Sequence, residues 1–313
     1  MKRIVYLLSI IYIVNSYAQE LTIPTHTQYL ADNPFVISPS FAGIGDYVKI
    51  RGNGLTQWVG IKDAPDMQSL AADMRIADAT GIGVFFYNDR NGNTRQYGGK
   101  FSFAHHLILD KYYDQFLSFG ISYNLNQFRV DIENFNVPDM AVTDDRSLTN
   151  HNFDLSILYR FKDSYLSFTA ANIINKDLDV FGINEPGRLR NYQVYAGYIL
   201  KENLNRSFEI EPSTYIQYFE SDGRSSTDLN IKLRWIQDND DYFWGGLSYR
   251  FLNDQFFNPI NIGPMGGIKK GSLYFAYSYQ LTTNELMAYN SGTHMITIGF
   301  DILQGISNCP CTF

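Results

Sequence analysis

The sequence of 313 residues has only two cysteines, and both lie among its last five residues. A framework of disulfides is therefore excluded as the support of the fold. After the first 18 residues, the chain has no run of about 20 apolar residues, which a transmembrane helix needs. Sustained helical periodicity is missing as well. These absences exclude a disulfide-rich secreted domain and a helical membrane protein.

Basic residues are also scarce, because 25 Lys and Arg stand against 32 Asp and Glu, for a net charge of -7. Nucleic-acid binding needs clustered Lys and Arg, so no nucleic-acid partner is expected. No Gly-rich phosphate loop opens a helix, so no nucleotide or other cofactor is predicted. The adjacent His105 and His106 face opposite sides of a strand, which is poor spacing for two ligands of one metal ion. We therefore expect neither a cofactor nor a metal site.

The amino terminus has the pattern of a secretory signal peptide over residues 1–18. Lys2 and Arg3 precede an apolar run, and small residues flank Tyr17 before the expected cleavage after Ala18. Residues 19–47 contain three prolines and little periodicity, which predicts an irregular periplasmic segment. We expect a β-barrel over residues 48–303 and a periplasmic carboxy-terminal tail over residues 304–313, and the pattern leaves the role of its two cysteines open.

Alternation of apolar and polar residues is what the sequence has in abundance. In residues 116–126, for example, Leu117 and Phe119 fall on one face of a strand, and Ser118 and Gly120 fall on the other. The polar face is not able to form a dry core. Aromatic residues make up 16% of the chain, which fits the interfacial aromatic girdles of an outer-membrane barrel. We therefore expect the apolar face to contact lipid and the polar face to line a lumen.

Fourteen stretches alternate in this way, an even number, as single-chain bacterial barrels have. They span residues 48–58, 67–76, 82–87, 95–109, 116–126, 152–161, 165–173, 192–200, 208–219, 227–236, 242–251, 259–268, 272–281 and 293–303. The predicted fold is an all-β transmembrane outer-membrane β-barrel of about 14 antiparallel strands. A soluble β-sandwich is the alternative.

The lengths of the connections favour the barrel over the sandwich, because outer-membrane barrels have short periplasmic turns and longer outer loops. Residues 162–164, 201–206, 237–241 and 269–271 make short connections. The connections 127–151, 174–190 and 282–292, which alternate with them, are longer. Sequential pairing then places both termini on the short, periplasmic side.

The last alternating run, residues 293–303, is predicted to close the barrel by pairing with the strand that starts near Val48. In this run His294 shares a face with Ile296, and Asp301 lies on the other face. A nucleophilic triad of Ser291, His294 and Asp301 would need all three side chains on one side. We therefore expect no enzyme, with an outer-membrane hydrolase as the disfavoured alternative.

Ten short motifs follow one another along nearly the whole mature chain. They are Asn33-Pro34, Ser38-Pro39-Ser40-Phe41-Ala42-Gly43, Gln57-Trp58-Val59-Gly60, Ala64-Pro65, Gly81-Ile82-Gly83, Phe103-Ala104-His105-His106, Leu117-Ser118-Phe119-Gly120, Tyr249-Arg250, Tyr277-Ser278-Tyr279 and Ser291-Gly292-Thr293-His294. In this order they resemble the PorP/SprF family of Bacteroidetes outer-membrane proteins. One departure is Met295, where the family usually has Glu.

The resemblance implies an outer-membrane barrel of the type IX secretion system that supports the export or the cell-surface anchoring of a partner adhesin. In gliding bacteria, it implies that this adhesin takes part in gliding motility. The expected partners are a secreted adhesin with a type IX sorting carboxy-terminal domain, the secretion machinery and membrane lipid. A diffusion porin or transporter is the alternative. Bulky residues expected to face inward, Trp244, Arg250 and Tyr274, indicate a filled interior and so disfavour it.

Three groups of residues are candidates for contact with a partner. The first lies at the end of the first predicted strand and in the loop beyond it, the second lies in the long loop 127–151, and the third lies on the last strand. The candidates are Gln57, Trp58, Gly60 and Pro65; Phe128 and Phe135; and His294 and Met295. An aromatic-belt residue followed by a turn, and a solvated loop, are the alternative interpretations of the first two groups.

Overall fold

The computed structural model describes residues 27–130, 146–175, 189–201, 207–237, 240–283 and 285–304. The predicted signal peptide, the candidate Phe135 and the two cysteines lie outside these ranges. Among the described residues, no helix is long and apolar enough to cross a membrane.

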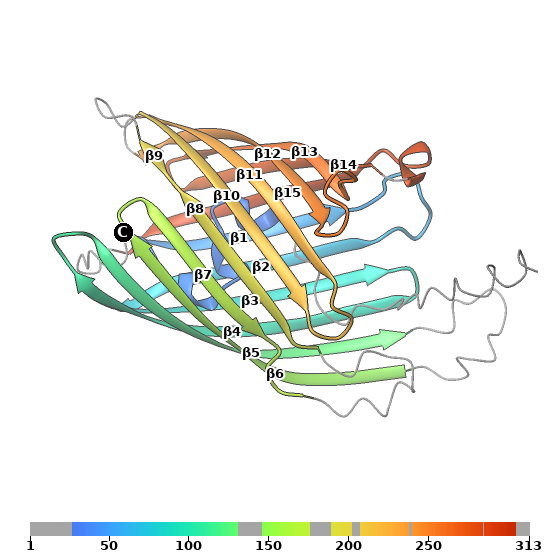
Figure 1. Cartoon of the computed structure of the whole chain (residues 1–313), viewed down its shortest axis with the longest axis horizontal. Helices are drawn as coiled ribbons and strands as arrows, with labels where there is room; N and C mark the ends of the chain where they lie inside the picture. Colours follow the sequence, from blue (N-terminus) through green and yellow to red (C-terminus); the bar gives the residue numbers. More distant parts are fainter. Residues whose placement is uncertain are drawn as a thin grey trace, which may run out of the picture.

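The described residues form one antiparallel sheet that closes on itself, as predicted (Figure 1). β8 and β9 flank Ile199 and pair with the same neighbour, β10, so they act as one strand of a 14-stranded barrel. The strands are β1 Tyr47–Thr56, β2 Asp66–Ala77, β3 Thr80–Asn91, β4 Thr94–Asp110, β5 Gln115–Val130, β6 Arg146–Phe161, β7 Ser164–Ala171, β8 Asn191–Tyr198, β9 Leu200–Lys201, β10 Phe208–Phe219, β11 Ser225–Ile236, β12 Tyr242–Leu252, β13 Asn261–Lys270, β14 Leu273–Thr282 and β15 Thr293–Leu303.

Closure occurs between the first and last strands. β1 pairs with β15 from Tyr47 opposite Leu303 to Thr56 opposite His294. The prediction that residues 293–303 close the barrel is therefore confirmed. Because every strand then has two neighbours, the sheet has no open edge along this seam.

The two faces of the wall follow the predicted alternation. In β5, Phe119 is 44% exposed on the outer face, and its neighbour Ser118 is fully buried in the interior. The same contrast holds in β15, where Ile298 faces outward and Thr297 inward. A continuous apolar outer surface of this kind is what lipid contact requires.

The connections divide the barrel into two ends. At the end where Tyr47 and Leu303 lie, the connections 78–79, 111–114, 162–163, 202–207, 237–241 and 271–272 are short, and we call this end the terminal rim. At the other end the connections include 57–65, 131–145, 172–190 and 283–292, and we call it the loop rim. The expected loop 127–151 is shorter than predicted, because β5 continues to Val130 and β6 starts at Arg146.

The lumen is occupied by the amino-terminal segment. Three short 3-10 turns, η1 Thr27–Leu30, η2 Pro34–Val36 and η3 Pro39–Phe41, are buried inside the wall (Figure 1). We call residues 27–44 the plug. The segment was expected in the periplasm, and the described part instead lies within the barrel. Its apolar side chains lack strand or helix periodicity because they pack against a surface that surrounds them.

Wall glycines make room for the plug. A Cβ atom at Gly120 would collide with the backbone of Pro39 and Ser40, and one at Gly83 would lie 2.5 Å from the ring of Phe35. A Cβ at Gly81 would collide with the Ala42 carbonyl. These inward positions therefore accept only glycine while the plug stays in place.

Replacing Gly120 by Ala is expected to displace the plug and to cost about 1–3 kcal/mol of stability, the usual range for overpacking. The measurement is the thermal unfolding midpoint of the purified barrel. Gly54→Ala is the matched control, because the site of its added methyl group has no atom within 4 Å. Equal midpoints for the two variants would contradict the close contact.

Candidate functional site

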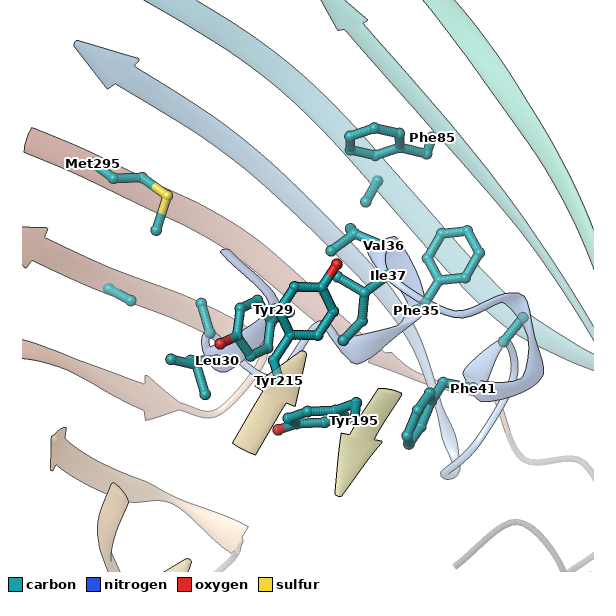
Figure 2. Close-up of a cluster of buried hydrophobic side chains, with 14 of the residues drawn as sticks. Tyr29, Leu30, Phe35, Val36, Ile37, Phe41, Phe85, Tyr195, Tyr215 and Met295 are labelled. Carbon is teal, nitrogen blue, oxygen red and sulfur yellow. The ribbon is translucent and has the colours of Figure 1, made fainter. Parts of the chain in front are cut away.

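An aromatic cluster holds the plug in the middle of the lumen. The ring of Tyr29 lies 5.4 Å from that of Tyr195 and 5.2 Å from that of Tyr215. Phe41 packs edge-on against Tyr165 with ring centroids 6.2 Å apart. Figure 2 shows these plug side chains pointing toward β8 and β10. Buried aromatic pairs of this kind stabilise the fold by more than the apolar area that they bury accounts for.

A charged cluster anchors the plug at Asp32. Its carboxylate accepts hydrogen bonds from Lys232 Nζ at 2.5 Å and Arg234 Nη2 at 2.9 Å, both on β11. The hydroxyl of Tyr242 on β12 donates to the same carboxylate at 2.6 Å. Arg234 also pairs with Glu209 of β10 at 2.8 Å. Asp32 of the plug thus pairs with the buried Lys232 and joins Glu209 of the wall in neutralising Arg234.

The pKa of Asp32 reflects this arrangement. Burial alone would raise the pKa of the carboxyl, but Lys232 and Arg234 outweigh burial and hold the pKa well below its usual value. A lowered pKa stabilises the folded state above the unfolded-state pKa, about 3.9 for Asp, and this contribution is lost as the pH falls toward the folded-state pKa.

The stability difference between the native protein and Asp32→Asn is therefore expected to stay constant from pH 8 to pH 5. It should shrink only below about pH 4, where the unfolded-state carboxyl binds a proton. Thermal unfolding of both proteins across this pH range measures the difference. A decline that begins near pH 6 would show that Lys232 and Arg234 do not hold the carboxylate.

A second polar network joins the plug to β11 and β12, nearer to the loop rim than the Asp32 cluster. The Tyr29 hydroxyl donates to Asp228 at 2.9 Å and accepts from Asn230 at 3.0 Å. Asp228 in turn accepts two hydrogen bonds from Arg250, each at 2.6 Å. Burial and the neighbouring Asp228 carboxylate raise the pKa of Tyr29 well above its ordinary value, so its hydroxyl stays protonated as the donor.

The short motifs of the sequence meet at the contact between plug and wall. Ser40 N donates to Ser156 Oγ at 2.9 Å, and Gly43 N donates to an Asp73 carboxylate oxygen at 2.9 Å. His106 Nε2 lies 3.1 Å from the Ala42 carbonyl. His106, which faces inward, therefore contacts the plug.

Above the plug, at the loop rim, lies a mouth of about 260 Å³. Gln57, Trp58 and Pro65, three of the candidate contact residues, line it together with Arg250 and Asp89. Trp58 has a φ of 46°, a left-handed conformation that is strained for a bulky residue. Strain of this kind persists only where the surroundings impose it, and it concentrates at functional sites.

Backbone hydrogen bonds fix the loop that carries Trp58. Gln57 N donates to the Pro65 carbonyl at 2.9 Å. Val59 exchanges backbone hydrogen bonds with the loop 283–292, to Gly292 at 3.1 Å and from Ser291 at 2.7 Å. The first and last loops of the barrel therefore hold the tryptophan at the mouth between them.

The remaining candidates lie apart from the mouth or beside it. Gly60 has a φ of 107° and shapes the loop next to Tyr289. Phe128, expected on a loop surface, is buried at the end of β5. Met295 is buried and lines a smaller pocket with Gln57. His294 faces outward, where its Nδ1 lies 2.7 Å from the Tyr277 hydroxyl.

The faces of β15 separate the residues of the considered triad. His294 lies on the outer face beside Tyr277. Asp301 faces the lumen and pairs with Arg51 at 2.5 Å, with both side chains at least 95% buried. The two side chains do not share a site, as the strand alternation predicted.

Sequence reasoning missed the plug and its anchors, above all Asp32, Tyr29 and Lys232. Two signals in the sequence pointed to them. The inward Lys232 needs a partner carboxylate where it is buried, because buried charges are paired. Inward glycines such as Gly120 leave space for another backbone.

Known structures with the same fold are outer-membrane barrels. CymD, a monoaromatic hydrocarbon channel, is 9% identical and has a TM-score of 0.51, over 90% of this chain and 93% of that chain. The toluene transporter TbuX of Ralstonia pickettii is 8% identical with a TM-score of 0.51, over 87% and 93% of the two chains. At these identities the likeness shows the fold alone. No curated protein sequence matches the chain.

The sequence profile of one family does match, and it spans residues 18–300, almost the full length. Its description is type IX secretion system membrane protein PorP/SprF. Fold and family together point to the outer membrane, and the resemblance of the short motifs is confirmed. This chain belongs to the PorP/SprF family of type IX secretion system membrane proteins.

Proposed function

We propose that this protein supports the export or the cell-surface anchoring of a secreted adhesin that carries a type IX sorting carboxy-terminal domain. The observation that carries the proposal is the mouth lined by Gln57, Trp58 and Pro65 above an occupied lumen. A rigid aromatic side chain in a small hollow is the usual anchor of a protein interface. Membership of the family supports a role beside the secretion machinery.

The proposed orientation places the loop rim outside the cell and the terminal rim, with both termini, in the periplasm. The short connections of the terminal rim and the longer ones of the loop rim support it, because outer-membrane barrels have this asymmetry. In this orientation the mouth faces a partner at the cell surface, and the secretion machinery meets the short turns. The role requires no covalent chemistry. In gliding bacteria the anchored adhesin would serve motility.

The alternative, a diffusion porin or transporter, has less support. A porin needs a continuous aqueous path, and here the plug fills the middle of the lumen with a cluster of apolar side chains. Trp244 and Tyr274 add to the filling, since both are buried and hydrogen-bonded to each other at 3.0 Å. The channels with a similar fold support only the architecture.

The test is deletion of the protein in its native bacterium, followed by labelling of the adhesin on intact cells with an antibody. Deletion is expected to remove the adhesin from the surface, and normal display would contradict the proposal. Complementation with Trp58→Ala is expected to restore roughly a tenth or less of the display, because truncating an interface anchor commonly costs tenfold or more in affinity.

Trp235→Ala is the matched control for this experiment. Trp235 lies on the outer face of β11, where it stacks on Phe243 with centroids 5.1 Å apart. It is an equally large truncation far from the mouth, so it is expected to leave display intact. Equal losses for the two variants would mean that Trp58 acts only through stability.

A further inference from the structure

The mouth at the loop rim holds a buried carboxylate. Asp89 lines it from the inner face of β3, two residues before that strand ends at Asn91. At about 3.3 Å per residue, Asp89 lies roughly 7 Å below the end of the strand. Only 8% of Asp89 is exposed, so the barrel wall encloses its side chain at the edge of the mouth. A long side chain that enters from the loop rim can reach it.

Asp89 has no counterion in the described part of the chain. No hydrogen bond or ion pair joins its carboxylate to another described side chain, and the charge that acts on it is that of Asp66 on β2, which is also negative. The adjacent Arg90 points to the outer face and lies 3.7 Å from Asp63. A buried charge without a counterion is costly, so Asp89 favours a cation supplied from outside the barrel.

The basic residues of the mouth already have partners. Arg250 donates two hydrogen bonds of 2.6 Å to Asp228. Arg224 lies 3.4 Å from Asp222. Among the described residues of the lining, the charged ones are these two arginines and Asp89. Because each arginine has its own carboxylate, the mouth presents one negative charge in excess.

An aromatic side chain lies in the same mouth. Trp58 lines it together with Asp89, and the face of an indole ring attracts an ammonium or guanidinium group. A cation in the mouth can therefore interact with a carboxylate and with an aromatic ring. The volume of about 260 Å³ is below the range of about 300–1,000 Å³ that is usual for pockets of small-molecule ligands. It offers space for one long side chain.

We propose that the mouth binds the basic side chain of a lysine or arginine that the secreted partner presents. Asp89 pairs with the charge of this side chain, and the ring of Trp58 packs on it. The inference rests on the proposed function and adds to it the chemistry that the partner presents to the barrel.

Ligands of other chemistry fit the mouth less well. An acidic side chain or a phosphate group would meet the excess negative charge of Asp89. An apolar side chain would remove Asp89 further from water without supplying a counterion. A calcium ion takes about six to eight oxygen ligands, and the residues that the structure describes contain no group of three acidic, histidine or cysteine side chains that could hold a metal ion.

The test uses the full chain purified in lauryldimethylamine oxide micelles. The probes are the tripeptides Gly-Lys-Gly and Gly-Arg-Gly, acetylated and amidated at their ends so that the side chain carries the only charge. Calorimetric titration is expected to show saturable binding with a dissociation constant on the order of 1 mM. Peptides with norleucine or glutamate in place of lysine are expected to bind at least about tenfold more weakly.

Two variants locate the site. Asp89→Asn removes the charge with little change of shape and is expected to weaken binding of the lysine peptide about tenfold. Asp254→Asn is the matched control, the same change at an exposed loop-rim position between β12 and β13, outside the lining of the mouth. It is expected to bind as the native protein does. Trp58→Leu is the second variant and is expected to weaken binding about threefold.

Thermal unfolding verifies that each variant folds. Asp89→Asn is expected to unfold at the same temperature as the native protein or at a higher one, because it removes a buried charge that has no counterion. If Asp89→Asn does not fold, Trp58→Leu decides, and unchanged binding by that variant then overturns the proposal.

Absence of saturable binding by both basic peptides overturns the proposal. Binding of the norleucine or glutamate peptide as tightly as the lysine peptide overturns it as well, and so does equal affinity of the native and Asp89→Asn proteins for the lysine peptide. These measurements use the isolated barrel, whereas the proposed function fails through normal adhesin display after deletion, so the two failures are separable.

Discussion

Removing residues 27–44 is expected to raise the conductance of the barrel in a planar lipid bilayer by on the order of tenfold, because 14 strands enclose more space than their own inward side chains fill. In the intact protein, Tyr29, Phe35 and Phe41 occupy the centre of that space. The wall that remains is polar, with buried serines and asparagines along β4 to β6. Water and ions are expected to enter once the plug is gone.

The deletion also leaves Lys232, Arg234 and Asp228 without their plug partners. These charged side chains would then face water instead of a dry interior, so hydration replaces part of the stabilisation that their ion pairs and hydrogen bonds to the plug supply. The barrel is expected to remain folded but less stable, which gel mobility before and after heating tests. If the deletion variant does not fold, the conductance of Gly120→Ala tests release of the plug in its place.

A crosslinked plug is the matched control. Thr27 Oγ1 and Ser278 Oγ lie 3.0 Å apart, so cysteines at the two positions are close enough for a disulfide after Cys309 and Cys311 are replaced by Ser. The locked protein is expected to keep the low conductance of the native chain, and reduction should leave it unchanged while the plug stays docked. A native protein that already conducts as strongly as the deletion variant would contradict the plugged lumen and favour the diffusion porin.

The strands were predictable from the sequence because lipid and lumen impose opposite polarity on successive residues. β5 and β15 show this most clearly. The apolar Phe119 and Ile298 are exposed on the outer face, and their polar neighbours Ser118 and Thr297 are buried on the inner face. Closure was predictable from the same alternation. Residues 293–303 are the last alternating run and the stretch after Val48 is the first, and the first and last strands of a closed barrel pair with each other. Strand ends were less accurate, and β3 extends to Asn91 where the alternation suggested an end at Tyr87.

The plug was not predictable from periodicity. Phe35 and Ile37 contact the wall from an irregular chain whose direction changes at Pro34 and Pro39, so no repeat of two or 3.6 residues appears. The sequence did contain the wall residues that the plug contacts, and these carried a signal. The inward Gly83 leaves space for another chain segment, which the Phe35 ring occupies, and the buried charge of Lys232 needs the plug carboxylate as its partner.

The candidate mouth was found only in part. Gln57, Trp58 and Pro65 were identified because a tryptophan followed by glycine and proline marks a shaped loop, and the structure brings all three to one hollow. Phe128 was misplaced, since the strand continues past it and turns it inward. Arg250, which lines the same mouth from β12, was expected only to fill the interior.

Replacing Arg51 by Ala is expected to cost about 3–5 kcal/mol, because it leaves the buried Asp301 carboxylate without its partner. Arg51 Nη1 lies 2.5 Å from Asp301, and the guanidinium stacks 4.1 Å above the ring of Tyr274. A Cβ at Gly299, directly opposite in the register, would lie 2.8 Å from Arg51 Nη1, so glycine there makes room for the guanidinium. The pair crosses the seam between β1 and β15.

The measurement is urea unfolding of the barrel in lipid vesicles, and two further variants make the result specific to the pair. Arg90→Ala removes an exposed arginine 3.7 Å from Asp63 with both side chains more than half exposed, so a change of about 0–1 kcal/mol is expected. The double variant Arg51→Met with Asp301→Leu replaces the ion pair by apolar groups and is expected to be more stable than Arg51→Ala. If Arg51→Ala and Arg90→Ala had equal effects, the barrel would be closed by its backbone ladder alone, and the charge pair at the seam would contribute nothing to closure.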